Sequence, residues 1–200
     1  MRFVPMDLMM TRVKKFGADS DTVLFHELLY AGEFIVKMTT AAVVSAIQDD
    51  REHHRFGLLH GLVRAGGVGI WANKLDEALT GPASQHLTDI AKEDRRVFNV
   101  QVGKGGWQYD AVRELQEVLR GVHSSAQTGG DKVTLRAWFS AFAEVRNKTR
   151  GHGAITPAVC VKLAPFLDRS IRLLCEHNPI FARPWAYLHR NLSESVRKLH

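Results

Sequence analysis

Cationic, amide and imidazole groups gather in residues 146 to 153 more densely than elsewhere in the chain. This stretch reads Arg-Asn-Lys-Thr-Arg-Gly-His-Gly. A guanidinium presents a planar fork of N–H donors that matches two phosphate oxygens, and an imidazole with its usual pKa of about 6.5 transfers protons near neutral pH. Arg146 and His152 therefore have the chemistry needed to bind a phosphodiester and to move a proton beside it.

The residues before this stretch predict an amphipathic helix, and Arg146 lies on its apolar side. Continued at about 100° per residue, the helix places Arg146 within roughly 20° of Leu135. Arginine is rarely buried unless it is paired. We therefore expect its guanidinium either to reach solvent at the helix end or to meet an anionic partner in a cleft. The apolar stripe consists of Leu135, Trp138, Phe139, Phe142 and Val145.

His152 can share a site with Arg146 only if the chain turns between them. On an unbroken helix the two side chains would point about 120° apart. Gly151 and Gly153 predict the turn, because glycine accepts the positive φ of a helix C-terminal cap. Thr156-Pro157 then has the residue types of an N-cap and a first helical position. His152 is expected in a short connector between helix ends, where functional side chains often lie.

The order Arg146-Asn147, four further residues and His152, at the end of a late helix, resembles the HEPN superfamily (higher eukaryotes and prokaryotes nucleotide-binding domains). Its ribonuclease members have an Arg, usually followed by a polar residue, a few positions before a His. The resemblance implies a helical domain and a composite site built by a two-fold homodimer. Members paired with nucleotidyltransferase antitoxins often have a Tyr two residues after the His. Ala154 occupies that position here, so regulation through such a tyrosine is not expected.

The chemistry that suits this stretch is metal-independent RNA cleavage by attack of a 2′-hydroxyl on the adjacent phosphodiester. His152 would be the acid and base, Arg146 would stabilise charge on the phosphoryl oxygens, and Asn147 would orient the phosphate or the imidazole. Lys148 and Arg150 would hold the RNA backbone by charge. The products would carry a 2′,3′-cyclic phosphate and a 5′-hydroxyl. The resemblance implies an endoribonuclease of bacterial antiviral defence, of a toxin system or of a stress response.

The same residues also have a purely structural explanation. Arg146 would neutralise a core carboxylate, Asn147 would cap the helix and His152 would bond a carbonyl in a turn. The alternative function is a non-catalytic HEPN-like nucleotide-binding, sensor or oligomerisation module of a larger protein. The nuclease and the non-catalytic module differ in the surroundings of His152, which would face an open basic cleft in the first and be sealed beneath its neighbours in the second. A sequence-specific DNA-binding protein is disfavoured, because no compact helix-turn-helix pattern occurs.

No metal and no cofactor are expected. The histidines at 53, 54 and 60 lack a surrounding Cys/His framework, and adjacent histidines point to different sides of a helix. The Gly-Lys-Gly-Gly run at 103–106 lacks the residue order of a phosphate-binding loop and has no strand before it, so a flexible turn is expected.

A long helix is expected from residue 20 or 21 to about residue 48. Its apolar residues spread over most of its circumference, which is typical of a central helix. A solvated face is the simplest account of its remaining polar strip, but Glu33 or His26 could also be an auxiliary group facing Arg146 and His152. The strip consists of His26, Tyr30, Glu33 and Lys37.

Apolar periodicity predicts the rest of a single all-α domain, residues 1–200, a HEPN-like bundle of six to eight helices. Residues 1–18 lack a clean period and are expected to form an N-terminal arm or a short first element. Leu87 and Ile90 should point inward, and Val161 should pack with its helix against the 135–146 helix. Residues 184–200 would extend toward a missing C-terminal region. Further helices are expected over 51–65, 70–79, 83–97, 110–123, 135–146, 157–176 (kinked at Pro165) and 181–192, with a mobile loop at 124–130.

Composition is that of a soluble globular protein, with 45% hydrophobic and 24% charged residues. The net charge of +6 suits RNA as a partner, although such a charge is not specific. Cys160 and Cys175 lie on one predicted helix and cannot bridge, which predicts buried thiols in a reducing compartment. No secretory signal and no run of eighteen apolar residues occurs, so a cytoplasmic protein without a membrane span is expected. The chain ends without a terminating signal, which leaves room for further domains or a cognate regulator.

Overall fold

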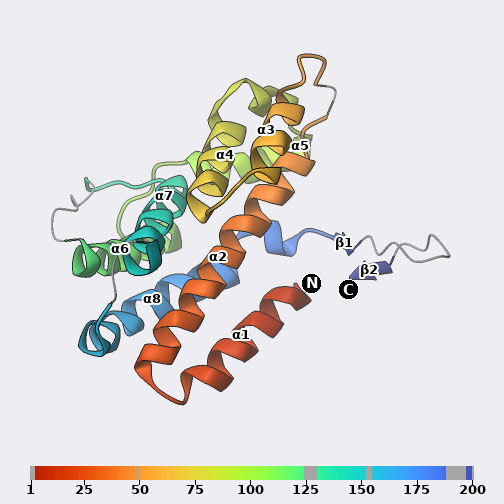
Figure 1. Ribbon diagram of the computed structural model, residues 1–200. Helices are drawn as coiled ribbons and strands as arrows, with labels where there is room; N and C mark the ends of the chain where they lie inside the picture. The colour runs from red at the N-terminus through yellow and green to blue at the C-terminus, as the bar shows by residue number, and fades with distance from the viewer. Residues whose placement is uncertain (1–2, 49, 124–129, 152–154, 188–196, 200) are drawn as a thin grey trace.

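The protein is described by a computed structural model that covers residues 3–48, 50–123, 130–151, 155–187 and 197–199 (Figure 1). In these ranges the chain forms eight α-helices, and the prediction of an all-α bundle of six to eight helices is confirmed. The helices are α1 (Val4–Gly17), α2 (Asp21–Ser45), α3 (His54–Val63), α4 (Val68–Thr80), α5 (Asp89–Asn99), α6 (Trp107–Val122), α7 (Leu135–Arg146) and α8 (Pro157–His177).

Shorter elements connect and follow these helices. Two of them are 3-10 helices, η1 (Pro82–His86) and η3 (Pro179–Ala182), and one is a π-helical turn, η2 (Asn147–Gly151). Strands β1 (Trp185–Tyr187) and β2 (Arg197–Leu199) pair antiparallel, with Trp185 opposite Leu199.

Helix α2 is the central element that the sequence predicts. The Ser20 hydroxyl accepts a hydrogen bond from the Val23 backbone N–H at 3.2 Å, which caps the helix where the sequence places its start. Figure 1 shows α2 running through the molecule, with α1 and α8 beside its first half and α3 and α4 beside its second half. Its buried apolar residues therefore face different neighbours on different sides.

By length and composition alone, α2 could cross a membrane. In the structure, 56% of its most apolar window is buried against the rest of the bundle. The core helix of a soluble protein passes the same test of length and hydropathy. The burial of α2 is thus explained by packing within the bundle.

Helices α2 and α7 approach closely at a glycine. A Cβ atom added to Gly32 would lie 2.1 Å from the ring of Phe142, so no larger residue fits without displacing that ring. Phe142 stacks in turn on Trp138, with ring centroids 5.1 Å apart. This contact brings the last turn of α7, which ends at Arg146, against α2 at Glu33.

Residues 4–17 form a helix that buries Met6 and Val13 against α2, so of the two expected forms, an arm or a short first element, the chain adopts the second. Other expected details at the element level are wrong. The helix expected over 83–97 is broken, because the Thr88 hydroxyl accepts the Ala91 N–H at 3.3 Å and starts a new helix. Leu87 is buried as expected, whereas Ile90 is 56% exposed.

Helix α8 and the residues after it also differ from expectation. Helix α8 packs mainly against α6 and α2 instead of α7, and Val161 is 52% exposed. The Ser170 hydroxyl explains part of this arrangement, because it accepts from Trp138 Nε1 at 2.8 Å and donates to the Ala111 carbonyl at 2.7 Å. Where a helix over 181–192 was expected, the chain forms η3 and then β1 beyond Pro184. Residues 188–196 and 124–129 lie outside the described ranges.

Candidate functional site

The chain widens into a π-helical turn immediately after Arg146. The side chain of Thr149 is buried, and its hydroxyl donates to the carbonyl oxygens of Val145 at 2.9 Å and Arg146 at 3.3 Å. These bonds satisfy carbonyl groups that the end of a helix would otherwise leave without a donor. Single π-helical turns are rare and are frequent at functional sites. The regular α-helix therefore ends at Arg146, and the π-helical turn runs from Asn147 to Gly151. The turn that Gly151 and Gly153 predict extends into residues outside the described ranges and stays a prediction.

Arg146 meets an anionic partner. Its Nε lies 3.3 Å from Oε2 of Glu33, and the two side chains are 21% and 22% exposed. Glu33 also accepts a hydrogen bond from Lys37 Nζ at 2.7 Å. Burial favours the neutral form of Glu33, but the bond and charge of Lys37 and the charge of Arg146 outweigh it and lower the pKa of the carboxyl group. One carboxylate thus lies between two cations.

The side chain of Asn147 lies beside the first turn of α4. A Cβ atom on Gly69 would be 3.8 Å from Asn147 Nδ2. At the opposite end of the same two helices, Arg136 of α7 pairs with Asp76 of α4, so the helices run antiparallel. The start of α4 therefore meets the end of α7.

Among the described residues, no side chain caps the start of α4. Its N-cap is Gly67, and a Cβ atom added there would have no neighbour within 4 Å. The first N–H groups of a helix and the positive end of its dipole attract anions. Asn147 and Lys148 are both exposed. The surface where α4 and α7 meet therefore combines an uncapped helix start with an amide and cationic side chains.

Two of the expected site residues cannot be placed. His152 lies outside the described residues, and so does the side chain of Arg150. The meeting of Arg146 with His152 therefore stays a prediction. His26 lies about 10 Å along α2 from Glu33 by helix geometry. Its ring makes an edge contact with Phe25, at 6.1 Å between centroids.

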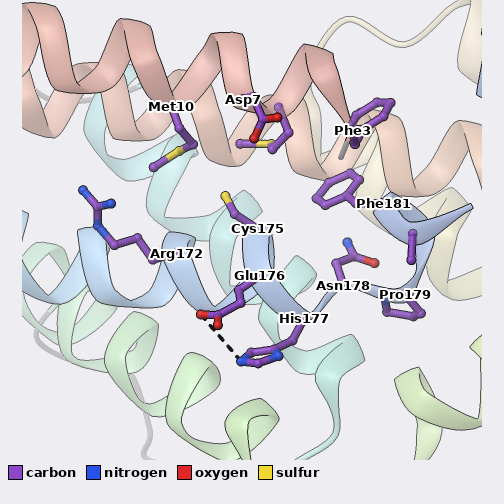
Figure 2. Close-up of a pocket in the computed structure, with 12 residues that line it drawn as sticks. Phe3, Asp7, Met10, Arg172, Cys175, Glu176, His177, Asn178, Pro179 and Phe181 are labelled. Carbon is purple, nitrogen blue, oxygen red and sulfur yellow. Dashed lines mark ion pairs between the residues drawn. The ribbon is translucent and has the colours of Figure 1, made fainter. Parts of the chain in front are cut away.

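A cavity lies away from this surface, between α1 and the C-terminal end of α8 (Figure 2). Its volume is about 610 Å³, and Asp7, Arg172 and Glu176 are among its charged lining residues. Burial raises the pKa of the Cys175 thiol in its wall to about 12, so this thiol stays protonated at neutral pH and is a poor nucleophile. Because α1 and α8 come from opposite ends of the chain, no local sequence pattern predicts this cavity.

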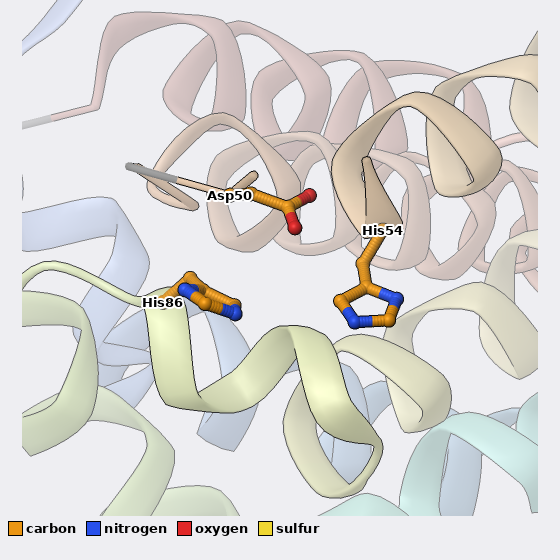
Figure 3. A group of neighbouring side chains, drawn as sticks. All are labelled: Asp50, His54 and His86. Carbon is orange, nitrogen blue, oxygen red and sulfur yellow. The ribbon is translucent and has the colours of Figure 1, made fainter. Parts of the chain in front are cut away.

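A cluster of possible metal ligands that the sequence does not predict consists of Asp50, His54 and His86 (Figure 3). Each offers an atom that can bind a metal ion, and these atoms lie within 4.8 Å of one another. The adjacent histidines at 53 and 54 do not predict this cluster, because the two other ligands come from the connection between α2 and α3 and from η1.

Comparison with protein-family models, with curated proteins and with solved structures found no match to this chain.

Proposed function

We propose that the protein is a metal-independent endoribonuclease with a HEPN-like arrangement, and that its active surface lies where α7 ends beside α4. The observation that carries the proposal is the position of Arg146. Its side chain is partly buried, its guanidinium is held through Nε by Glu33, and the next residue carries an amide that borders an uncapped helix start. This combination suits a phosphate group better than a neutral ligand.

Arg146 is suited to bind the scissile phosphate through Nη1 and Nη2. Among the residues that the structure describes, its guanidinium makes one hydrogen bond, through Nε. A guanidinium held at Nε keeps its fork of terminal nitrogens in one orientation, which favours binding to two phosphoryl oxygens. Asn147 would orient the phosphate, and Lys148 would hold the neighbouring RNA backbone.

His152 would transfer protons from the connector that follows η2. In this proposal it accepts the proton of the attacking 2′-hydroxyl or protonates the departing 5′-oxygen. One chain supplies one such imidazole, so a two-fold homodimer would provide the second. RNA is the proposed substrate class, and the proposed context is a cytoplasmic bacterial defence, toxin or stress response.

One observation favours a second candidate, a non-catalytic nucleotide-binding or oligomerisation module. Arg146 already has an anionic partner in Glu33, and a partly buried arginine paired in this way needs no ligand. In that case the uncapped start of α4 and the exposed Asn147 would bind a nucleotide phosphate without cleaving it.

Cleavage of total RNA in EDTA separates the two candidates. We expect wild-type protein to leave 2′,3′-cyclic phosphate and 5′-hydroxyl ends, and His152→Ala and Arg146→Ala each to reduce cleavage at least a hundredfold. Arg169→Ala is the matched control, because Arg169 forms an exposed ion pair with Glu114 on the surface of α8. Thermal melting must show that each variant is folded.

Unchanged cleavage by folded His152→Ala would remove His152 from its role. Absence of cleavage by the wild type, together with nucleotide binding that Arg146→Ala abolishes, would support the non-catalytic module.

A further inference from the structure

The connection between α2 and α3, the start of α3 and the end of η1 bring two imidazoles and a carboxylate together. Figure 3 shows Asp50, His54 and His86 arising from these three segments around one space. Their ligand atoms lie within 4.8 Å of one another, and all three side chains are partly buried. This cluster is separate from the surface around Arg146.

Backbone hydrogen bonds fix the two strand-like segments that carry Asp50 and His86. Ile47 and Leu87 form an isolated antiparallel β-bridge. The Gln48 N–H donates to the His86 carbonyl at 2.8 Å, and the Thr88 N–H donates to the Ala46 carbonyl at 3.0 Å. The position of His86 relative to the end of α2 is therefore set by the main chain and does not depend on the side chains of the cluster.

Asp50 has one oxygen engaged and one without a donor. Oδ2 accepts the backbone N–H of Arg55 in the first turn of α3. Oδ1 is shielded from solvent and has no hydrogen-bond partner in the described part of the chain. A shielded anionic oxygen without a donor needs a cation.

The spacing suits a metal ion better than a direct hydrogen bond. Ligand atoms bound to one Zn²⁺ at about 2.0–2.2 Å lie about 3–3.6 Å apart, which small rotations of these side chains can reach. Two imidazoles and one carboxylate are typical of zinc and neighbouring first-row divalent ions, whereas Mg²⁺ and Ca²⁺ prefer oxygen ligands alone. Glu52 lies 2.8 Å from Nε2 of His54, so two carboxylates would balance the charge of a divalent ion.

The backbone at the cluster is unusual as well. His53, the N-cap of α3, has φ of 61°, the left-handed region that side chains other than glycine seldom adopt. Among the described residues it is the one such position outside glycine. Sparsely populated backbone conformations of this kind are frequent at ligand-binding sites. Here the conformation starts α3 so that His54 follows directly beside Asp50.

We propose that Asp50, His54 and His86 bind a zinc-class divalent metal ion, which fastens the first turn of α3 to η1 and to the end of α2. Helix α3 needs such an anchor, because it buries two side chains, Leu58 and Leu62. Phe56 and Val63 on the same helix are 68% and 87% exposed. Open cavities of about 590 and 290 Å³ border His86 and Asp50, which gives the ion a path of entry.

Calorimetric titration of chelator-treated, full-length protein with ZnCl₂ tests this site. We expect one Zn²⁺ per chain, and at least about tenfold weaker binding in His86→Ala and in Asp50→Asn. Asparagine keeps an oxygen that can accept the Arg55 N–H, so the second variant retains the start of α3. His60→Ala is the matched control, because His60 is an exposed histidine on the same helix outside the cluster. Its affinity should equal that of the wild type.

Thermal melting gives a second readout. Zn²⁺ should raise the melting temperature of the wild type and of His60→Ala but not that of His86→Ala. Wild-type protein that binds no Zn²⁺ would overturn the proposal. Equal binding by wild type, His86→Ala and Asp50→Asn would also overturn it, since the ion would then occupy other surface histidines. Failure here leaves the nuclease proposal standing, because that reaction is tested in EDTA.

Discussion

Glu33 shares its single negative charge between Arg146 and Lys37, and in the nuclease proposal this arrangement prepares Arg146 for a phosphate. A carboxylate at Nε orients a guanidinium and lowers its net charge. A phosphate that arrives at Nη1 and Nη2 then meets a pre-oriented donor pair with Lys37 nearby. The same ion pair explains how an arginine on the apolar stripe of α7 is tolerated.

Replacing Glu33 by Gln should destabilise the protein by about 1 kcal/mol near pH 7, because two cations lose their shared carboxylate. The pKa of Glu33 is lowered on folding from 4.5. Its contribution to stability is therefore present above pH 4.5 and is lost as pH falls through the lower folded value. Urea unfolding near pH 7 and near pH 3 should show the difference between wild type and variant shrinking at the lower pH.

Glu117→Gln is the matched control for this experiment. Glu117 pairs with Arg120 on the exposed side of α6, where an ion pair one turn apart contributes little. A Glu33→Gln variant as stable as the wild type near pH 7 would show that the ion pair of Glu33 with Arg146 adds nothing to the free energy of unfolding.

At the scale of elements, the contact between α2 and α7 places the candidate site. Gly32 lets the ring of Phe142 lie against the α2 backbone. Glu33 follows Gly32 directly, and Arg146 lies one helical turn after Phe142, so the ion pair stands beside this contact. A change at Gly32 would therefore act on Arg146 through the separation of the helices.

Gly32→Ala should destabilise the protein by about 1–3 kcal/mol, since its methyl group would overlap the Phe142 ring. The variant should also weaken RNA cleavage if the nuclease proposal holds, because Arg146 would be displaced from Glu33. Urea unfolding measures the first effect, and the EDTA cleavage assay measures the second.

Gly57→Ala provides the comparison, because a Cβ atom on Gly57 of α3 would meet no atom within 4 Å. Alanine at an open helical position should leave stability unchanged or raise it by up to about 1 kcal/mol. Equal effects of the two substitutions would contradict close packing at Gly32.

At the scale of the whole molecule, the proposed reaction needs an acid and a base, and the candidate stretch of one chain supplies one imidazole. A general acid and a general base act on opposite sides of the scissile bond, and residues 146–152 contain one imidazole. A two-fold dimer would present both imidazoles to one RNA.

We therefore predict a homodimer whose cleavage rate per chain falls on dilution below its dissociation constant. Sedimentation velocity over a concentration series, combined with cleavage at the same concentrations, checks this. A chain that sediments as a monomer while keeping full activity would refute the composite site and leave a single-chain mechanism.

The amino-acid sequence by itself determined the helical architecture and the local chemistry of the 146–152 stretch. Apolar stripes at helical spacing must be buried against some part of the chain, whichever part that is. The spacing of apolar residues therefore predicts α2, α4, α6, α7 and α8. Caps such as Ser20 act within one turn of the chain, so they too follow from local sequence.

Only the tertiary structure decided which distant groups meet. A polar strip on a central helix is compatible with solvent or with a partner, so nothing local assigned Glu33 to Arg146. His54 and His86 come together because a β-bridge joins Ile47 to Leu87, and hydrogen bonds between remote main-chain segments have no local pattern. The chain after Pro184 forms strands in place of the expected helix for the same reason, because β1 depends on pairing with β2.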